Sequence, residues 1–259
     1  MQPVHPQLEL AFELADAADA ITMSRFRAPD LRVETKPDMT PVSEADHAVE
    51  QALTDLLHRA RPGHGVVGEE LGSHGSSSSR WIIDPIDGTK NYVRGIPIFA
   101  TLIALQVGGE GIAAIVSAPA LGRRWWAARG EGAHSDGRRI QVSRVARLGD
   151  AQLCYGSIDA WEEAGMLERF LELTRRCWRH RGFGDFFTHM LVAEGCAEIA
   201  LEGPGVKLWD LAAPKILVEE AGGTLTALGG EDTAGGGSAV TSNGLLHNEV
   251  LDLLGIPAV

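Results

Sequence analysis

The segment WIIDPIDGTKN, residues 81–91, places two carboxylates three residues apart directly after an apolar run. Asp-Pro-x-Asp-Gly forms a good turn, because Pro presets φ, Asp bonds its own backbone and Gly accepts positive φ. The turn does not explain the apolar run Trp81–Ile83, which predicts a short buried strand. Asp84 and Asp87 would therefore stand at the C-terminal edge of a sheet, where the ligand crevices of sheet proteins tend to lie.

Three further acidic residues stand beside turn or strand-end signals: Asp46 in TPVSEAD, Glu69 in VVGEE and Asp210 in LWD. A lone Asp at a helix start is usually a cap, and both Asp46 and Asp210 also fit that role. Asp84 is different, because a half-buried carboxylate requires a partner or a metal. No Arg or Lys stands at an obvious pairing distance in its motif.

These residues predict the hydrolysis of a phosphate ester. Carboxylates and a backbone carbonyl, with no His or Cys nearby, select a hard divalent cation such as Mg²⁺. Pro85 lacks an N–H group, and Ile86 can turn its carbonyl inward as a further ligand. Gly88 and Thr89 open a short segment whose free N–H groups can hold a phosphate. Two cations bridged by Asp84 would hold both the attacking water and the leaving oxygen.

A different phosphatase class also carries an acidic motif that ends in Asp-Gly-Thr. In haloacid dehalogenase-type phosphatases the motif is D-x-D-G-T, and the first Asp is the nucleophile. Here the position two before Asp87 is Pro85, which has no nucleophilic group. That class is excluded at this site.

The chain resembles the inositol monophosphatase family of Mg²⁺-dependent phosphatases over nearly its whole length. The resemblance rests on GEE at 68–70, WIIDPIDGTKN at 81–91, AARGEGA at 127–133 and LWDLAAPKILVEEAGGTL at 208–225. It implies an α/β (α+β layered) fold with alternating helix and sheet layers, usually in a homodimer. It also implies a phosphate monoester as the small-molecule substrate.

The resemblance further implies a set of site residues. Glu69, Asp84 and the Ile86 carbonyl match the first metal site, and Asp84, Asp87 and Asp210 match the second. A third, weaker ion at Glu69 would bring the total to two or three Mg²⁺ ions.

Thr89, oriented by Asp46, resembles the family's water-positioning pair and completes a catalytic set with Glu69. The residues expected to contact the substrate on its phosphate side are Asp87, Gly88, Thr89 and Asp210.

Within the family, the chain is most similar to the actinobacterial-type histidinol-phosphate phosphatases, through TKPDMTPVSEAD at 35–46, RRWWAARGEGA at 123–133 and RGFGDFFTHMLVAEG at 181–195. This resemblance implies hydrolysis of L-histidinol phosphate to L-histidinol and phosphate in histidine biosynthesis. Asp185 stands where inositol-specific relatives tend to have a small neutral residue, and it also fits a helix N-cap. Asp185 and Glu202 are expected at the pocket mouth, facing the cationic end of the substrate.

Two alternatives remain open at this point. The same chemistry could act on inositol phosphates or another small sugar phosphate. A non-catalytic protein could instead bind a partner and keep the motif as a relic, although every expected ligand is present.

Composition excludes several other classes of function. With 35 acidic and 23 basic residues the net charge is −12, so non-specific binding to nucleic acid or to an anionic membrane is not expected. No apolar run approaches the ~20 residues of a membrane span. The N-terminus does not read as a signal peptide, and three Cys without CxxC spacing suit a reducing compartment. We therefore expect a cytoplasmic protein.

Apolar periodicity predicts the elements that position these residues. Helices are expected over 6–26, 44–59, 162–176, 185–195 and 211–221, and strands over 150–155, 197–202 and 223–228. An antiparallel meander is expected over 99–107, 111–118 and 123–129, with surface loops at 74–80 and 229–238. Residues 1–147 would form a first half with the GEE and DPIDGT motifs, and 148–259 a second half with the WD motif, in one intimate unit.

Two further expectations concern single residues. Pro214 departs from the usual Gly of the family, and it is expected in the first turn of a helix, where Pro is tolerated. The expected solvated histidines in polar loops are His64, His74, His134 and His247.

Overall fold

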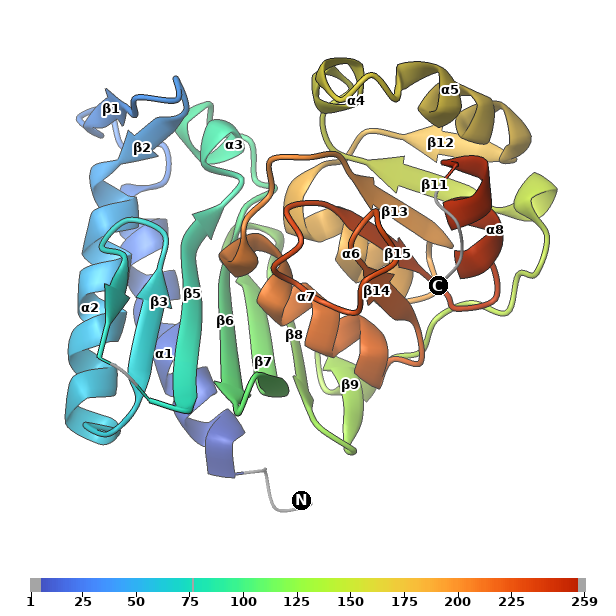
Figure 1. The fold of residues 1–259 in the computed structure, drawn as a ribbon. Helices are drawn as coiled ribbons and strands as arrows, with labels where there is room; N and C mark the ends of the chain where they lie inside the picture. Colours follow the sequence, from blue (N-terminus) through green and yellow to red (C-terminus); the bar gives the residue numbers. More distant parts are fainter. Residues whose placement is uncertain (1–5, 76, 256–259) are drawn as a thin grey trace.

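Helix layers and sheet layers alternate across the protein. A computed structural model describes residues 6–75 and 77–255. In Figure 1 the layers run helix, sheet, helix, sheet, helix, which confirms the predicted α/β layered fold. The helices are α1 (Pro6–Arg25), α2 (Glu44–Ala60), α3 (Thr89–Val93), α4 (Asp159–Glu163), α5 (Leu167–Arg176), α6 (Asp185–Ala193), α7 (Leu208–Glu220) and α8 (His247–Leu253).

The larger sheet has the strand order β10-β9-β8-β7-β6-β5-β3-β4 within the described residues. Its neighbours are antiparallel except for the parallel pair of β3 and β5. The predicted meander is confirmed by β6, β7 and β8. The strands are β3 (Gly65–Gly68), β4 (Ser73–His74), β5 (Ser79–Asp87), β6 (Ala100–Val107), β7 (Glu110–Ala118), β8 (Arg123–Ala128), β9 (Gly132–Ser135) and β10 (Arg138–Arg139).

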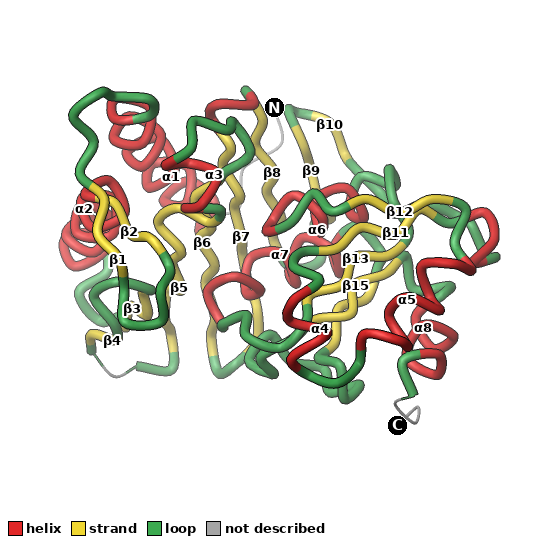
Figure 2. The backbone as a smooth tube through the Cα atoms, turned by 90° about the horizontal axis from the view of Figure 1, so that it is seen from above, coloured by secondary structure: helices red, strands yellow, loops and turns green. Residues whose placement is uncertain are grey.

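The smaller sheet mixes both directions. Its order is β12-β11-β13-β15-β14, with β11 parallel to both β12 and β13 and the other pairs antiparallel. Figure 2 shows it beside the larger sheet, with α6 and α7 between the two. Its strands are β11 (Gln152–Tyr155), β12 (Arg179–Arg181), β13 (Ile199–Glu202), β14 (Thr224–Thr226) and β15 (Ala239–Ser242), and a separate hairpin pairs β1 (Val33–Thr35) with β2 (Pro41–Ser43).

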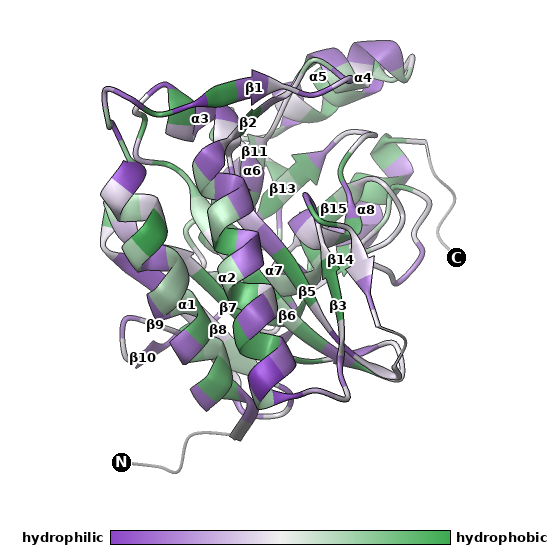
Figure 3. Ribbon diagram, turned by 90° about the vertical axis from the view of Figure 1, so that its left-hand side faces the viewer, coloured by the Kyte–Doolittle hydropathy of each residue, from purple (hydrophilic) through white to green (hydrophobic). Residues whose placement is uncertain are grey.

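The outer helices cover the larger sheet because their apolar residues recur every four positions. Val49, Leu53 and Leu57 of α2 are fully or almost fully buried. They pack with α1 and with Trp81 and Ile83 of β5. Figure 3 views α1 and α2 in front of this sheet. Ser43 and Asp46 form a capping box that starts α2, so the local signal and the packing agree.

Strand β5 is buried on both faces. Ile82 points to the opposite side from Trp81 and Ile83 and packs in the cluster that contains α6 and α7. The register against β6 shifts between Asp84 and Asp87, so the strand ends in an irregular turn. The two aspartates therefore sit at the end of a strand whose two faces are covered.

The middle helices join the two sheets. Phe186 and Met190 of α6 and Leu217 of α7 are buried in one cluster with Leu102 and Trp125 of the larger sheet. The division of the chain near residue 147 stays a prediction. Among the residues that the structure describes, no helix combines the length and apolar character that crossing a membrane requires.

Some expectations for the helices are wrong. The helix expected over 162–176 is interrupted, because Gly165 has a φ of +68° between α4 and α5. Helix α7 begins at Leu208, so Pro214 lies in its second turn rather than its first. The missing N–H group of Pro214 leaves the carbonyl of Asp210, four residues earlier, without its helical donor.

His247 also differs from expectation. It is buried rather than solvated, and its two ring nitrogens lie 3.0 Å from the hydroxyls of Ser242 and Thr226. These hydroxyls come from two strands of the smaller sheet, so His247 fastens the start of α8 to that sheet.

Candidate active site

A cavity of about 390 Å³ opens at the C-terminal end of β5. Its wall combines the β1–β2 hairpin, the start of α3 and the first residues of α6 and α7. The residues of the sequence-derived site that line it are Glu69, Asp84, Ile86, Asp87, Gly88, Thr89, Asp185 and Asp210. The fold thus brings together residues that lie up to 141 positions apart, from Glu69 to Asp210.

Three aspartates form the centre of this cavity. Oxygens of Asp84, Asp87 and Asp210 all lie within 4.8 Å of one another. Asp84 is 1% exposed and Asp87 is 7% exposed. Among the described residues, Asp84 Oδ1 has no hydrogen-bond partner. A buried, unpartnered carboxylate oxygen between two others is the arrangement that a bound cation would satisfy.

Two of these aspartates also serve helix starts. Asp87 Oδ2 accepts a hydrogen bond of 2.6 Å from the N–H of Phe186, at the first turn of α6. Asp210 Oδ2 accepts one of 2.5 Å from the N–H of Lys207, the N-cap of α7. The capping role expected for Asp210 is confirmed, and it coexists with its place among the three aspartates. One oxygen of each side chain is held by backbone.

The trio is electrostatically unfavourable on its own. Burial raises the pKa of Asp84 and of Asp87 well above the ordinary carboxyl value, and the neighbouring carboxylates raise both further. Burial likewise raises the pKa of Asp210, to about 6. A small divalent cation prefers carboxylate ligands, and its charge would relieve the repulsion between these close carboxylate oxygens. The residues present therefore fit Mg²⁺.

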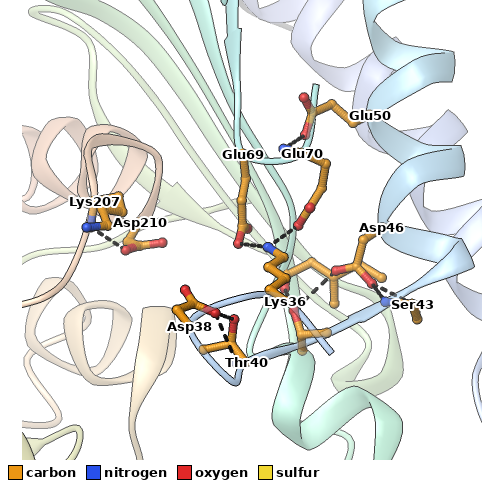
Figure 4. Close-up of polar contacts among 12 residues, drawn as sticks. Lys36, Asp38, Thr40, Ser43, Asp46, Glu50, Glu69, Glu70, Lys207 and Asp210 are labelled. Carbon is orange, nitrogen blue, oxygen red and sulfur yellow. Dashed lines mark hydrogen bonds and ion pairs between the residues drawn. The ribbon is translucent and has the colours of Figure 1, made fainter. Parts of the chain in front are cut away.

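Glu69 lies beside this trio and contacts a residue that the sequence did not single out. Its carboxylate pairs with Lys36 Nζ at 2.7 Å, and Glu70 pairs with the same nitrogen at 2.5 Å (Figure 4). Burial raises the pKa of Glu69, and the Lys36 ammonium opposes that shift. Lys36 stands between β1 and β2, so no local signal connected it with Glu69. The hairpin fold makes the contact.

Thr89 and Asp46 meet next to the cavity. Thr89 Oγ1 lies 3.1 Å from Asp46 Oδ1 and 2.9 Å from the carbonyl oxygen of Ile86. Asp46 is fully buried and is also fixed by the N–H and the hydroxyl of Ser43, at 2.8 and 2.6 Å. Asp46 thus sits behind Thr89, and only Thr89 lines the cavity.

Gly88 gives the cavity a wall of bare backbone. It has a φ of +82°, and a Cβ there would lie 3.0 Å from the carbonyl oxygen of Ile98 and 3.3 Å from Asp185 Oδ2. A side chain would therefore crowd the approach between the start of α3 and the start of α6.

A second cavity of about 120 Å³ adjoins the first, sharing Asp87, Asp185 and Asp210 with it. Glu202, at the end of β13, lines this smaller cavity and is 8% exposed. Its Oε1 has no hydrogen-bond partner within residues 6–75 and 77–255. Burial and then the charges of Asp185 and Asp210 raise the pKa of Glu202 well above the ordinary value. His189, buried on α6, was not recognised in the sequence and also lines this cavity.

Asp185 is not the N-cap of α6. That position is Gly184, and the Asp185 side chain makes no capping bond. Asp185 instead has a φ of +53°, and its Oδ2 lies 3.4 Å from Asn91 Nδ2. Its carboxylate is therefore available to the two cavities, while Asp87 accepts a hydrogen bond from the buried N–H of Phe186 at the start of the helix.

This donor set on a layered α/β fold is typical of divalent-metal phosphatases. The model of the inositol monophosphatase family matches residues 4–255, and the chain belongs to that family.

Individual relatives are similar over nearly the whole chain. The histidinol-phosphatase of Streptomyces coelicolor is 54% identical over 256 residues, covering 95% of this chain and 96% of the relative. The histidinol-phosphatase of Mycobacterium tuberculosis is also 54% identical, covering 96% and 98%. Among solved structures, the IMPase of Thermotoga maritima superposes with a TM-score of 0.87 at 29% identity, covering 97% of each chain.

The crowded carboxylates predict a pH-dependent stability of the metal-free protein. The pKa of Asp210 rises from 3.8 to about 6 on folding. Between these values the folded state keeps a proton that the unfolded state has lost, so this contribution is full below 3.8 and is lost as pH rises through about 6. Thermal unfolding of chelator-treated wild type and Asp210→Asn across this window should show a steeper loss for wild type. If stability changed equally with pH in both proteins, the raised pKa of Asp210 would be contradicted.

Proposed function

We propose that the protein is a Mg²⁺-dependent phosphomonoesterase that hydrolyses L-histidinol phosphate to L-histidinol and phosphate, in histidine biosynthesis. One observation carries the proposal: two adjoining cavities each contain a buried carboxylate oxygen without a partner among the described residues, Asp84 Oδ1 and Glu202 Oε1. The first suits metal ions that hold a phosphate, and the second suits a cationic group. Histidinol phosphate carries both kinds of group, joined by a short chain.

We propose that the metal ligands are the residues expected from the sequence. They are Glu69, Asp84, the Ile86 carbonyl, Asp87 and Asp210, holding about two to three Mg²⁺ ions. When bound, such ions supply positive charge that neutralises the phosphate and acidifies water. The net charge of −12 makes this necessary, since the protein by itself repels a phosphate anion.

Thr89 is proposed to orient the attacking water. If its hydroxyl donates to Asp46, across 3.1 Å, its lone pairs remain free to accept a hydrogen bond from water. Asp46 is buried and fixed by Ser43, so this acceptor stays in place beside the Thr89 hydroxyl. Gly88 lines the cavity with backbone alone, which leaves its N–H for the phosphate.

Asp185 and Glu202 are proposed to select the substrate. A charged amine that enters the small cavity would stabilise the ionised form of both acids, because burial raises the pKa of Asp185 and of Glu202. The hydroxyls of an inositol ring would leave that charge uncompensated, so the structure favours histidinol phosphate over this second candidate. The two relatives at 54% identity carry the name histidinol-phosphatase, which supports the same choice. We further propose a homodimer, which sedimentation would test.

Removing one charge from the aspartate trio should abolish turnover. Asp84→Asn keeps the shape of the side chain but weakens the attraction for the cations. We expect a loss of about 100-fold or more in kcat, because charge stabilisation in the transition state is a large share of catalysis. Phosphate release should be measured at saturating Mg²⁺, with circular dichroism as the control for folding. Near wild-type turnover would exclude Asp84 as a ligand.

Removing the Thr89 hydroxyl should affect kcat rather than KM. Thr89→Ala removes the group proposed to orient water, a contribution made mainly in the transition state. We expect kcat to fall about 100-fold, the lower range for proton-handling groups. Thr89→Ser, which keeps the hydroxyl, is the matched control and should retain most activity. A raised KM with unchanged kcat would make Thr89 a binding residue only.

Substrate selection can be separated from phosphate chemistry. Asp185→Asn and Glu202→Gln each remove a charge but keep the shape, and Asn tolerates the positive φ at position 185. We expect KM for histidinol phosphate to rise about tenfold or more, the value of one charged hydrogen bond. KM for glycerol phosphate, which has no cation, should change little. Equal losses on both substrates would assign these acids a structural role and favour the inositol-type alternative.

A further inference from the structure

Glu50 is a buried carboxylate that none of the proposed catalytic steps uses. It lies on α2 with an exposure of 1%. Its two oxygens accept hydrogen bonds of 2.7 Å each, one from the N–H of Leu71 and one from the N–H of Glu70, which Figure 4 shows. A carboxylate that accepts from two neighbouring backbone N–H groups fixes the orientation of that loop segment, here residues 70–71. The segment follows directly after Glu69.

The neighbouring backbone is shaped around this carboxylate. A Cβ on Gly68 would lie 1.9 Å from Glu50 Oε1. Any side chain at that position would therefore push the carboxylate away from its two donors. Glu50 therefore contacts the backbone on both sides of Glu69 in the sequence. Gly68 precedes Glu69, and the two N–H donors follow it.

The same carboxylate stands in an unfavourable electrostatic position. Burial raises the pKa of Glu50, the two backbone hydrogen bonds oppose the shift, and the charges of Glu70 and Glu69 raise it further. Lys36 pairs with Glu69 and Glu70 but not with Glu50 within the part of the chain that the structure describes. A core position filled by an apolar residue would avoid this repulsion. The acid is explained by the loop, whose two backbone N–H groups need acceptors at this position.

Helix α2 carries a second such contact one turn earlier. Asp46 holds the Thr89 hydroxyl, and Glu50 is four residues further along the same face. One helix therefore sets the position of Thr89 and of the loop with Glu69 relative to each other.

We propose that Glu50 is a positioning residue, which holds the Glu69–Leu71 loop so that the Glu69 carboxylate faces Asp84 and completes the metal site. The inference rests on the proposed function, because Glu69 is a metal ligand only in that proposal. Residues that orient metal ligands typically change metal affinity or activity by about 10- to 100-fold when removed.

The test compares Mg²⁺ dependence among variants. For Glu50→Ala we expect the half-saturating Mg²⁺ concentration to rise about tenfold or more, while KM for histidinol phosphate at saturating Mg²⁺ stays unchanged. The same rise should appear in the Mg²⁺ concentration needed to increase the melting temperature, which does not depend on turnover. Val49→Ala is the matched control, since Val49 is buried on the same helix and packs with α1 instead of the loop.

Two further variants keep the test decisive if Glu50→Ala does not fold. Glu50→Gln retains one acceptor and should need an intermediate Mg²⁺ concentration. Gly68→Ala leaves Glu50 intact but displaces it, and should resemble Glu50→Ala. Combining Gly68→Ala with Glu50→Ala should add no further rise, because both remove the same contact.

The outcomes separate the two proposals. If wild type shows no Mg²⁺-dependent release of phosphate from any monoester, the proposed function is wrong. If wild type is active and the Glu50 and Gly68 variants need no more Mg²⁺ than Val49→Ala, the positioning role is wrong and the function stands.

Discussion

The site depends on one electrostatic constraint, which is the burial of many carboxylates close together. Each buried ion costs several kcal/mol unless charge and hydrogen bonds compensate it. The structure compensates part of this cost with backbone donors. The N–H groups of Phe186, Lys207 and Ser43 bond Asp87, Asp210 and Asp46, respectively. Asp84 Oδ1 lacks such a donor among the described residues, and it lies where the acids converge. The rest of this unfavourable free energy is offset by the packing of the core, which holds the acids in place.

The layered fold allows the core to hold the carboxylates together against their repulsion. β5 is covered by helices on both faces, so its end cannot relax away from the repulsion. α7 packs on the same sheet and brings Asp210 to the end of β5. Acids that repel each other are therefore fixed by elements whose apolar faces are buried elsewhere. A cation then gains from a site already formed, instead of having to assemble it.

The sequence predicted the parts of this arrangement that are local. The apolar run before Asp84, the turn at Asp87 and the capping patterns at Asp46 and Asp210 are each readable within a few residues. The meander followed from periodicity, and the layered fold was what the family resemblance implied. The features that the sequence did not predict depend on contacts between distant parts of the chain. Lys36 reaches Glu69 only through the β1–β2 hairpin.

Other failures also came from tertiary contacts that local patterns do not contain. His247 is buried because two strands of the smaller sheet supply hydroxyls to it. Asp185 fitted an N-cap by its sequence, but Asp87, 99 residues before Phe186, accepts the hydrogen bond from the Phe186 N–H at the helix start. The break between α4 and α5 is different, because its cause is local: Gly165 has a φ of +68°. The roles of the site residues stay predictions.

The contact between Asp87 and the N–H of Phe186 bears on how the proposed roles in phosphate chemistry and in substrate choice are divided. It joins the aspartate trio to the start of α6 through a backbone donor, so it does not depend on which side chain stands at position 185. Asp185 precedes that donor directly, and its φ of +53° is a conformation that Asn or Gly would also accept. The side chain at 185 can therefore change without moving the metal site. Glu202 comes from β13 in the smaller sheet and meets Asp185 across the small cavity. In the proposed function, selectivity therefore comes from two side chains, Asp185 on α6 and Glu202 on β13.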